Sequence, residues 1–218
     1  PFHYFGINDF TIDGENAESL EFNKLVNDKR VELVMEKAQY YGYSGEKVKG
    51  LIFVSRVDEA KKLSLLFNER GWKTAVLSGE DSEEERERII ESLEADNGLD
   101  YIISVDVLNE GVDIPSVNQI IMLRPTESAI IFVQQLGRGL RKIDNKKYVV
   151  VLDFIANYQK NYLIPIALSG DKSYQKQKYR EFLTELDVIT PDITTIEFDE
   201  VVKERVFKQI NKATIGGK

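Results

Sequence analysis

The chain has 218 residues, 42% of them hydrophobic, which is enough for one well-buried domain with extensions or for two small domains. Asp and Glu outnumber Lys and Arg by 37 to 29, and the formal charge of −8 excludes a uniformly basic nucleic-acid binder, so any surface for nucleic acid must be local. With no cysteine and a single histidine, His3, the chain lacks the residues for disulfides, thiol catalysis or a zinc centre, and we expect no metal site.

No segment of the sequence predicts a membrane partner. No apolar run approaches the roughly 18 residues that a membrane span needs, and the first residues lack the basic head and apolar middle of a signal peptide. We therefore expect a cytoplasmic protein. Because the chain begins without methionine, we also expect it to be a piece of a longer protein.

Residues 1–48 predict a helical lead-in. Between Asp13 and Gln39, apolar residues recur among charged residues with roughly helical spacing. The turn-prone stretch that follows contains Gly42 and ends this pattern. We expect a helix that ends near Gly42.

From Gly50 onward, short apolar runs rich in β-branched residues alternate with amphipathic, charged stretches. The runs predict five buried strands, at 51–54, 74–77, 101–105, 117–123 and 148–152. The stretches between them predict helices over 57–70, after the capping box Ser82-x-x-Glu85, and from Thr126 through Leu136. Alternating strands and helices imply an α/β fold of three layers, with a parallel sheet covered on both faces. In such a sheet, ligands bind where the carboxyl ends of the strands open.

The regular alternation stops after Asp153. The next residues are aromatic and apolar, and a final amphipathic helix is predicted over 199–210. We expect residues 154–218 to form a C-terminal extension that packs back on the domain formed by residues 49–153.

Two arginines, Arg138 and Arg141, stand near the end of the helix predicted from Thr126. A spacing of three residues puts both guanidinium groups on one face of the helix. Alone, the pair would be a solvated basic helix end, but Gly137 and Gly139 destabilise a helix and indicate the close approach of another group. Planar guanidinium groups suit phosphate oxygens.

The loop after the third predicted strand ends at Pro115. Within it, Gly111 can adopt backbone angles closed to other residues, and Asp113 can accept a hydrogen bond from a hydroxyl or pair with arginine. Alone, this loop is an ordinary strand-to-helix connection.

Taken in order, four segments resemble motifs of the second RecA-like domain of superfamily-two helicases and translocases. They are Leu51–Ser55 (the fourth motif), Leu77-Ser78-Gly79 with Arg86, Asn109–Pro115 (the fifth motif), and Gln134-x-x-Gly137-Arg138-x-x-Arg141 (the sixth motif). Their wording is closest to bacterial DNA-acting members, such as excision-repair helicases and restriction-enzyme motor subunits. DEAD-box RNA helicases have His where Gln134 stands. The resemblance implies a parallel RecA-like sheet over residues 49–153.

The resemblance also implies an ATP-driven motor whose active site lies between two domains. Arg138 and Arg141 would reach the γ-phosphate as arginine fingers, and Gln134 would couple the attacking water or the domain contact. The residues on the ribose and phosphate side would be Gly111, Asp113 and Gly137. The residues that touch nucleic acid would be Ser55, Arg56, Ser78, Gly79 and Ser104.

No run matches Gly-x-x-x-x-Gly-Lys followed by Ser or Thr, which is the phosphate-binding P-loop. ATP and Mg²⁺ would therefore be bound mainly by an N-terminal P-loop domain of the same parent chain, and this chain alone would show little ATP turnover. Asp58-Glu59-Ala60-Lys61 imitates a metal-binding motif by spelling, but its position favours the acidic first turn of a helix.

Two alternatives stay open on the sequence. The chain could be a nucleic-acid-binding or docking module that keeps the RecA-like fold without a motor partner, or an unrelated nucleotide-sugar-binding α/β domain. A docking module has no need of an arginine pair aimed at a nucleotide cleft, and the four motifs in order argue against the sugar-nucleotide alternative. The sequence does not decide between DNA and RNA as the track.

Overall fold

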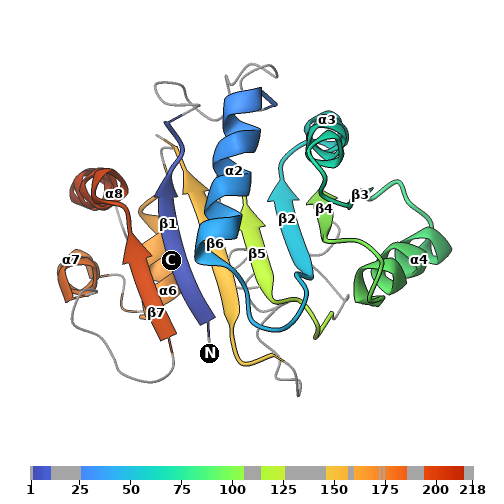
Figure 1. The fold of residues 1–218 in the computed structure, drawn as a ribbon. Coiled ribbons are helices and arrows are strands. Elements are labelled where there is room, and N and C mark those ends of the chain that lie inside the picture. The colour runs from blue at the N-terminus through green and yellow to red at the C-terminus, as the bar shows by residue number, and fades with distance from the viewer. Residues whose placement is uncertain are drawn as a thin grey trace.

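The computed structural model describes residues 2–10, 26–105, 114–125, 146–156, 160–171, 173, 175–185 and 194–213. Its centre is a sheet of seven parallel strands in the order β3-β4-β2-β5-β6-β1-β7 (Figure 1). The strands are β1 (Phe2–Asn8), β2 (Gly50–Val54), β3 (Thr74–Leu77), β4 (Tyr101–Val105), β5 (Gln119–Met122), β6 (Val149–Ile155) and β7 (Thr194–Phe198). The helices are α2 (Asp28–Tyr41), α3 (Val57–Glu69), α4 (Glu83–Glu94), α6 (Leu163–Ser169), α7 (Lys176–Glu185) and α8 (Glu200–Lys212).

Local sequence signals account for the helix ends that were predicted. Asn27 caps α2 by accepting a hydrogen bond from the amide of Arg30 at 2.8 Å, and the helix ends at Gly42, whose φ of 64° is readily adopted only by glycine. Ser82 caps α4 by accepting from the amide of Glu85 at 3.2 Å. These features confirm the predicted end of the lead-in helix and the predicted start of α4. The helix predicted from Thr126 lies outside the described residues.

All five predicted strands are present, and two strands were not predicted. β1 comes from the lead-in and β7 from the C-terminal extension, and β1 pairs with β6 on one side and with β7 on the other. β6 is longer than predicted because its register with β1 continues to the pair Ile155 and Asn8. Strands from all three expected segments, 1–48, 49–153 and 154–218, therefore belong to one sheet.

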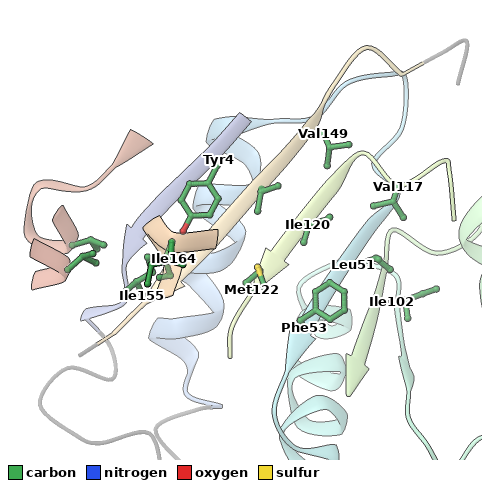
Figure 2. Close-up of a cluster of buried hydrophobic side chains, with 14 of the residues drawn as sticks. Tyr4, Leu51, Phe53, Ile102, Val117, Ile120, Met122, Val149, Ile155 and Ile164 are labelled. Atoms are coloured by element: carbon green, nitrogen blue, oxygen red, sulfur yellow. The ribbon is translucent and has the colours of Figure 1, made fainter. Parts of the chain in front are cut away.

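The strands from β1 to β6 send alternate side chains into two different cores, which makes three layers. In β2, Leu51 and Phe53 join the core covered by α4, α6, α7 and α8, whereas Ile52 and Val54 join the core covered by α2 and α3. Figure 2 shows the first of these cores, with residues of β1, β2, β4, β5 and β6 side by side. Each fully buried side chain of this size stabilises the fold by about 1.5–3 kcal/mol. The α/β fold with a parallel, RecA-like sheet is confirmed.

Within the described part of the chain, no helix is long and apolar enough to cross a membrane.

Candidate functional site

The loops that were predicted to contact nucleic acid leave the sheet at one edge. Ser55 directly follows β2 and Ser78 directly follows β3, and both strands pair with β4, which lies between them. Because the strands are parallel, their carboxyl ends open on the same side. Two strand spacings separate the loops, or roughly 10 Å.

The structure separates the five predicted contact residues by exposure. Ser55, Arg56 and Gly79 are exposed, whereas Ser78 and Ser104 are buried, with exposed fractions of 4% and 0%. The side chains of the two buried serines are therefore closed to solvent in this structure, and Ser55, Arg56 and Gly79 are the predicted contact residues that stand exposed.

Each buried serine has a structural reason for its position. The hydroxyl and the amide of Ser78 both bond to Oδ2 of Asp81, at 3.1 and 2.6 Å, and this builds the turn that presents Gly79. Ser104 stands in β4 at the register of Phe53 and Leu77, both in the core of Figure 2. Both faces of β4 are buried, so a serine inside this strand is buried whichever face it takes. The sequence analysis assigned Ser104 to the contact loop although it lies within the predicted strand 101–105.

The turn at Gly79 is also held by α4. The guanidinium of Arg86 donates from Nη2 to the carbonyl of Gly79 at 3.2 Å. The segment that resembled a helicase motif, with Arg86 seven residues after Gly79, thus forms one hydrogen-bonded unit.

Arg56 points into solvent and forms an ion pair with Asp58. Nε and Nη2 donate to the two carboxylate oxygens at 3.1 and 2.7 Å, and the side chains are 43% and 54% exposed. The hydrogen bond from Arg56 lowers the pKa of the Asp58 carboxyl. Oδ1 of Asp58 also accepts from the amide of Glu59 at 2.9 Å. Both residues lie in the first turn of α3, so the prediction that this acidic pair begins a helix is confirmed.

Glu59 has a different role, which the sequence analysis missed. It is 1% exposed and bonds through Oε1 to Nη1 of the fully buried Arg30 at 3.1 Å, while Oε2 accepts from the amide of Ser55 at 3.4 Å. Burial raises the pKa of Glu59, and the nearby charge of Arg30 offsets part of this rise. A signal was available, because Arg30 and Glu59 both stand on the apolar stripes of their helices.

The predicted catalytic and nucleotide-binding residues lie outside the described residues. These are Gln134, Gly137, Arg138 and Arg141 of the sixth motif, with Gly111 and Asp113 of the fifth. Their roles stay predictions. Among the residues that the structure describes, no group of three His, Cys, Asp or Glu side chains could hold a metal ion.

The parallel sheet and the loops at its carboxyl edge define a RecA-like domain. The pattern of the helicase conserved C-terminal domain matches residues 31–142, just over half of the chain, and the chain belongs to this family.

Two curated relatives cover most of this chain. The "Putative ATP-dependent helicase IRC3" of Saccharomyces cerevisiae is 27% identical over 152 residues, which are 68% of this chain and 22% of that protein. The UvrABC system protein B of Helicobacter pylori is 26% identical over 184 residues, which are 82% of this chain and 26% of that protein. The chain thus spans about a quarter of the length of these relatives.

A solved structure with a similar fold is that of the yeast DEAD-box splicing factor Prp28. It superposes with a TM-score of 0.62 and 17% identity, over 94% of this chain and 36% of that one. At this level of identity the likeness concerns the fold alone.

Proposed function

We propose that this chain is the C-terminal motor domain of an ATP-dependent helicase or translocase that acts on nucleic acid, most simply DNA. It would complete an ATP site together with an N-terminal P-loop domain of the same parent protein. The observation that carries the proposal is the shared carboxyl edge of the sheet, where the Ser55–Arg56 loop and the Gly79 turn stand exposed in a chain of the helicase C-terminal family.

The exposed groups at this edge suit a phosphate backbone without reading its sequence. Arg56 offers a guanidinium, which binds phosphate oxygens through two parallel hydrogen bonds. Gly79 has no side chain in the way of a strand, and apart from its chain neighbours no atom lies within 4 Å of the position that a Cβ would occupy. Contacts of this kind position a strand and tolerate any base, as movement along nucleic acid requires.

The acidic face of α4 is turned away from the nucleic acid in this proposal. Six of its glutamates are exposed: Glu83, Glu84, Glu85, Glu87, Glu91 and Glu94. These six carboxylates outnumber the one exposed arginine of the helix, Arg88, so the surface is net negative and repels phosphate, which restricts the strand to the loops at the sheet edge.

The predicted roles at the nucleotide follow the chemistry of phosphoryl transfer. Arg138 and Arg141 would stabilise the charge that develops on the γ-phosphate, with Gln134 at the attacking water or the domain contact. Such an arginine finger contributes about 10³–10⁵ in rate. ATP and Mg²⁺ would be bound mainly by the P-loop domain, with Gly111, Asp113 and Gly137 on this side of the nucleotide.

The test is nucleic-acid-stimulated ATP hydrolysis by the parent protein, or by this chain recombined with its P-loop partner domain. Arg141→Ala should lower kcat by about 10³-fold or more, with folding and nucleic-acid binding retained, because only stabilisation of the transition state is lost. The 218-residue chain by itself serves as the control and should turn over little or no ATP.

Unchanged turnover in Arg141→Ala would contradict the motor function and favour a docking module that keeps the fold. Robust turnover by the isolated chain would contradict the shared site. Comparing stimulation by single-stranded DNA with that by RNA of the same sequence identifies the track, and stimulation by RNA alone would overturn the DNA part of the proposal.

A further inference from the structure

A fully buried arginine links three segments at the carboxyl edge of the sheet. Arg30, in the first turn of α2, donates from Nε to Oδ2 of Asp9 at 2.9 Å, from Nη1 to Oε1 of Glu59 at 3.1 Å, and from Nη2 to the carbonyl of Leu123 at 2.8 Å. Asp9 follows β1, Glu59 lies in the first turn of α3, and Leu123 follows β5. Arg30, Asp9 and Glu59 are each at most 1% exposed.

This network leads directly to the loop proposed to contact nucleic acid. Glu59 uses its second oxygen, Oε2, to accept from the amide of Ser55, the residue before Arg56. Arg30 thus acts on the backbone of the loop through one carboxylate. On its other side, Leu123 lies only three residues before 126–145, the segment that contains Gln134, Arg138 and Arg141.

The need to fill space in the core does not explain why an arginine and two carboxylates are buried together. Taking an arginine and two carboxylates out of water is costly, and apolar residues of similar volume often stabilise a core equally well. What a planar guanidinium adds is fixed direction, because its donors lie in a rigid fork. The three acceptors come from segments that are 21, 29 and 93 residues away from Arg30, so the fork fixes their relative positions.

We propose that Arg30 is a positioning residue for nucleic-acid binding, which holds the Ser55–Arg56 loop through Glu59 and aligns it with the chain that leaves β5 at Leu123. The inference rests on the proposed function, and it gives residues of the lead-in a part in that function. A lysine at position 30 keeps the charge but has no planar fork, so it cannot serve all three acceptors in the same geometry.

The experiment compares the parent protein with its Arg30→Lys variant in nucleic-acid binding and in ATP turnover. In the Arg30→Lys variant, the half-saturating concentration of single-stranded nucleic acid should rise about tenfold. This rise should be larger than the fall in kcat at saturation. The slope of log K against log salt should decrease by about one, because Arg56 no longer meets its phosphate. If Arg30→Lys only lowered the stability of the fold, the molecules that remain folded would keep the wild-type salt slope.

Arg70→Lys is the matched control. Arg70 also bridges from α3 to α2, through a 2.6 Å contact with Asp28, but the Asp28 side chain is 70% exposed. This variant should bind nucleic acid within twofold of the wild type. Glu59→Gln is the second test variant, because it keeps the shape of the side chain and weakens its bonds to Arg30 and Ser55. It should shift binding in the same direction as Arg30→Lys, and it decides the question if that variant does not fold.

The two proposals fail in different ways. Unchanged affinity and salt slope in Arg56→Ala would contradict the proposed strand contact itself. The positioning role of Arg30 alone would be overturned by a different result. In that case Arg56→Ala binds nucleic acid more weakly, while the folded Arg30→Lys variant, or Glu59→Gln, keeps the binding and the salt slope of the wild type.

Discussion

At the scale of single residues, two groups compete for the exposed guanidinium of Arg56 at the carboxyl edge: the phosphate that we propose it binds and a neighbouring carboxylate. The guanidinium of Arg56, proposed to bind phosphate, already has a carboxylate partner in Asp58, with bond lengths of 3.1 and 2.7 Å. A phosphate must displace this carboxylate to bind in the same two-pronged way. Because both side chains are largely solvated, the ion pair is weak, and a phosphate can displace the carboxylate.

Replacing Asp58 with Asn should therefore strengthen nucleic-acid binding. We expect the Kd of Asp58→Asn to fall by up to about fivefold at low salt, with the difference shrinking at high salt. Glu36→Gln removes the same charge from another exposed ion pair, with Lys37 at 3.0 Å, and serves as the control for net charge. Titration of labelled single strands at two salt concentrations measures both variants. Equal effects of the two substitutions would show that Asp58 acts only through net charge.

A second residue-scale feature is a buried carboxyl in β6. Asp153 is 2% exposed and accepts a hydrogen bond from the hydroxyl of Tyr4 in β1 at 2.6 Å. Burial raises the pKa of Asp153 to about 7, although the hydrogen bond from Tyr4 lowers it in part. The Asp153 carboxyl therefore binds a proton more tightly in the folded state than in the unfolded state, where it has its ordinary pKa of 3.8.

The stability that this proton supplies is fully present below about pH 4 and is lost as the pH rises toward about 7. Asp153→Asn cannot ionise, so it should be about as stable as the wild type near pH 4 and more stable at pH 8, by up to about 4 kcal/mol. Urea unfolding of both chains from pH 4 to pH 8 measures this difference. Asp96→Asn, at an exposed carboxylate, is the control. A constant difference between Asp153→Asn and the wild type across this range would contradict the assignment.

At the scale of elements, β1 connects the C-terminal extension to the sheet. It lies between β6 and β7, and it is the partner of β7 in the described sheet. Two further bonds reinforce this connection: the amide of Asp199 donates to the carbonyl of Gly6 at 2.8 Å, and Arg205 of α8 donates to Oδ1 of Asn8 at 3.3 Å. We therefore expect the structure of the extension to depend on residues 2–8.

Removal of residues 1–8 should selectively loosen the extension. Without β1, the backbone groups of β7 lose their ladder and must bond to water, so their amide hydrogens should exchange much faster. The amides of β4, which lies between β2 and β3, should keep their protection and act as the internal control. Hydrogen exchange followed by mass spectrometry reports both regions in one experiment. Unchanged protection of residues 194–198 would mean that the helices of the extension, and not β1, hold β7 in place.

At the scale of the whole molecule, patterns within the sequence were sufficient for the class of fold. Five strands were predictable because burial on both faces makes each of them a continuous apolar run. Most of the helices were predictable because burial of one face imposes a period of 3.6 residues. The cap at Ser82 acts within three residues, and the order of four motifs along residues 51–141 indicated the helicase family. These are local features, and each can be read without knowing what lies beside it.

The tertiary structure decided whatever depends on partners that are distant in the chain. β1 is rich in aromatic residues and becomes a strand because residues 149–155 and 194–198 pair with it. Ser104 was predicted to contact a strand of nucleic acid, but it is buried within β4, because helices cover both faces of the sheet at this strand. Arg30 looked like one charge among many on a helix, and its role follows from three acceptors that only the fold brings together. The sequence by itself determined five of the strands, the helices α2, α3, α4 and α8, and the family, because these depend on patterns within short segments. The packing of distant segments determined the strands β1 and β7, and it determined which polar residues are exposed at the carboxyl edge and which are buried beneath it.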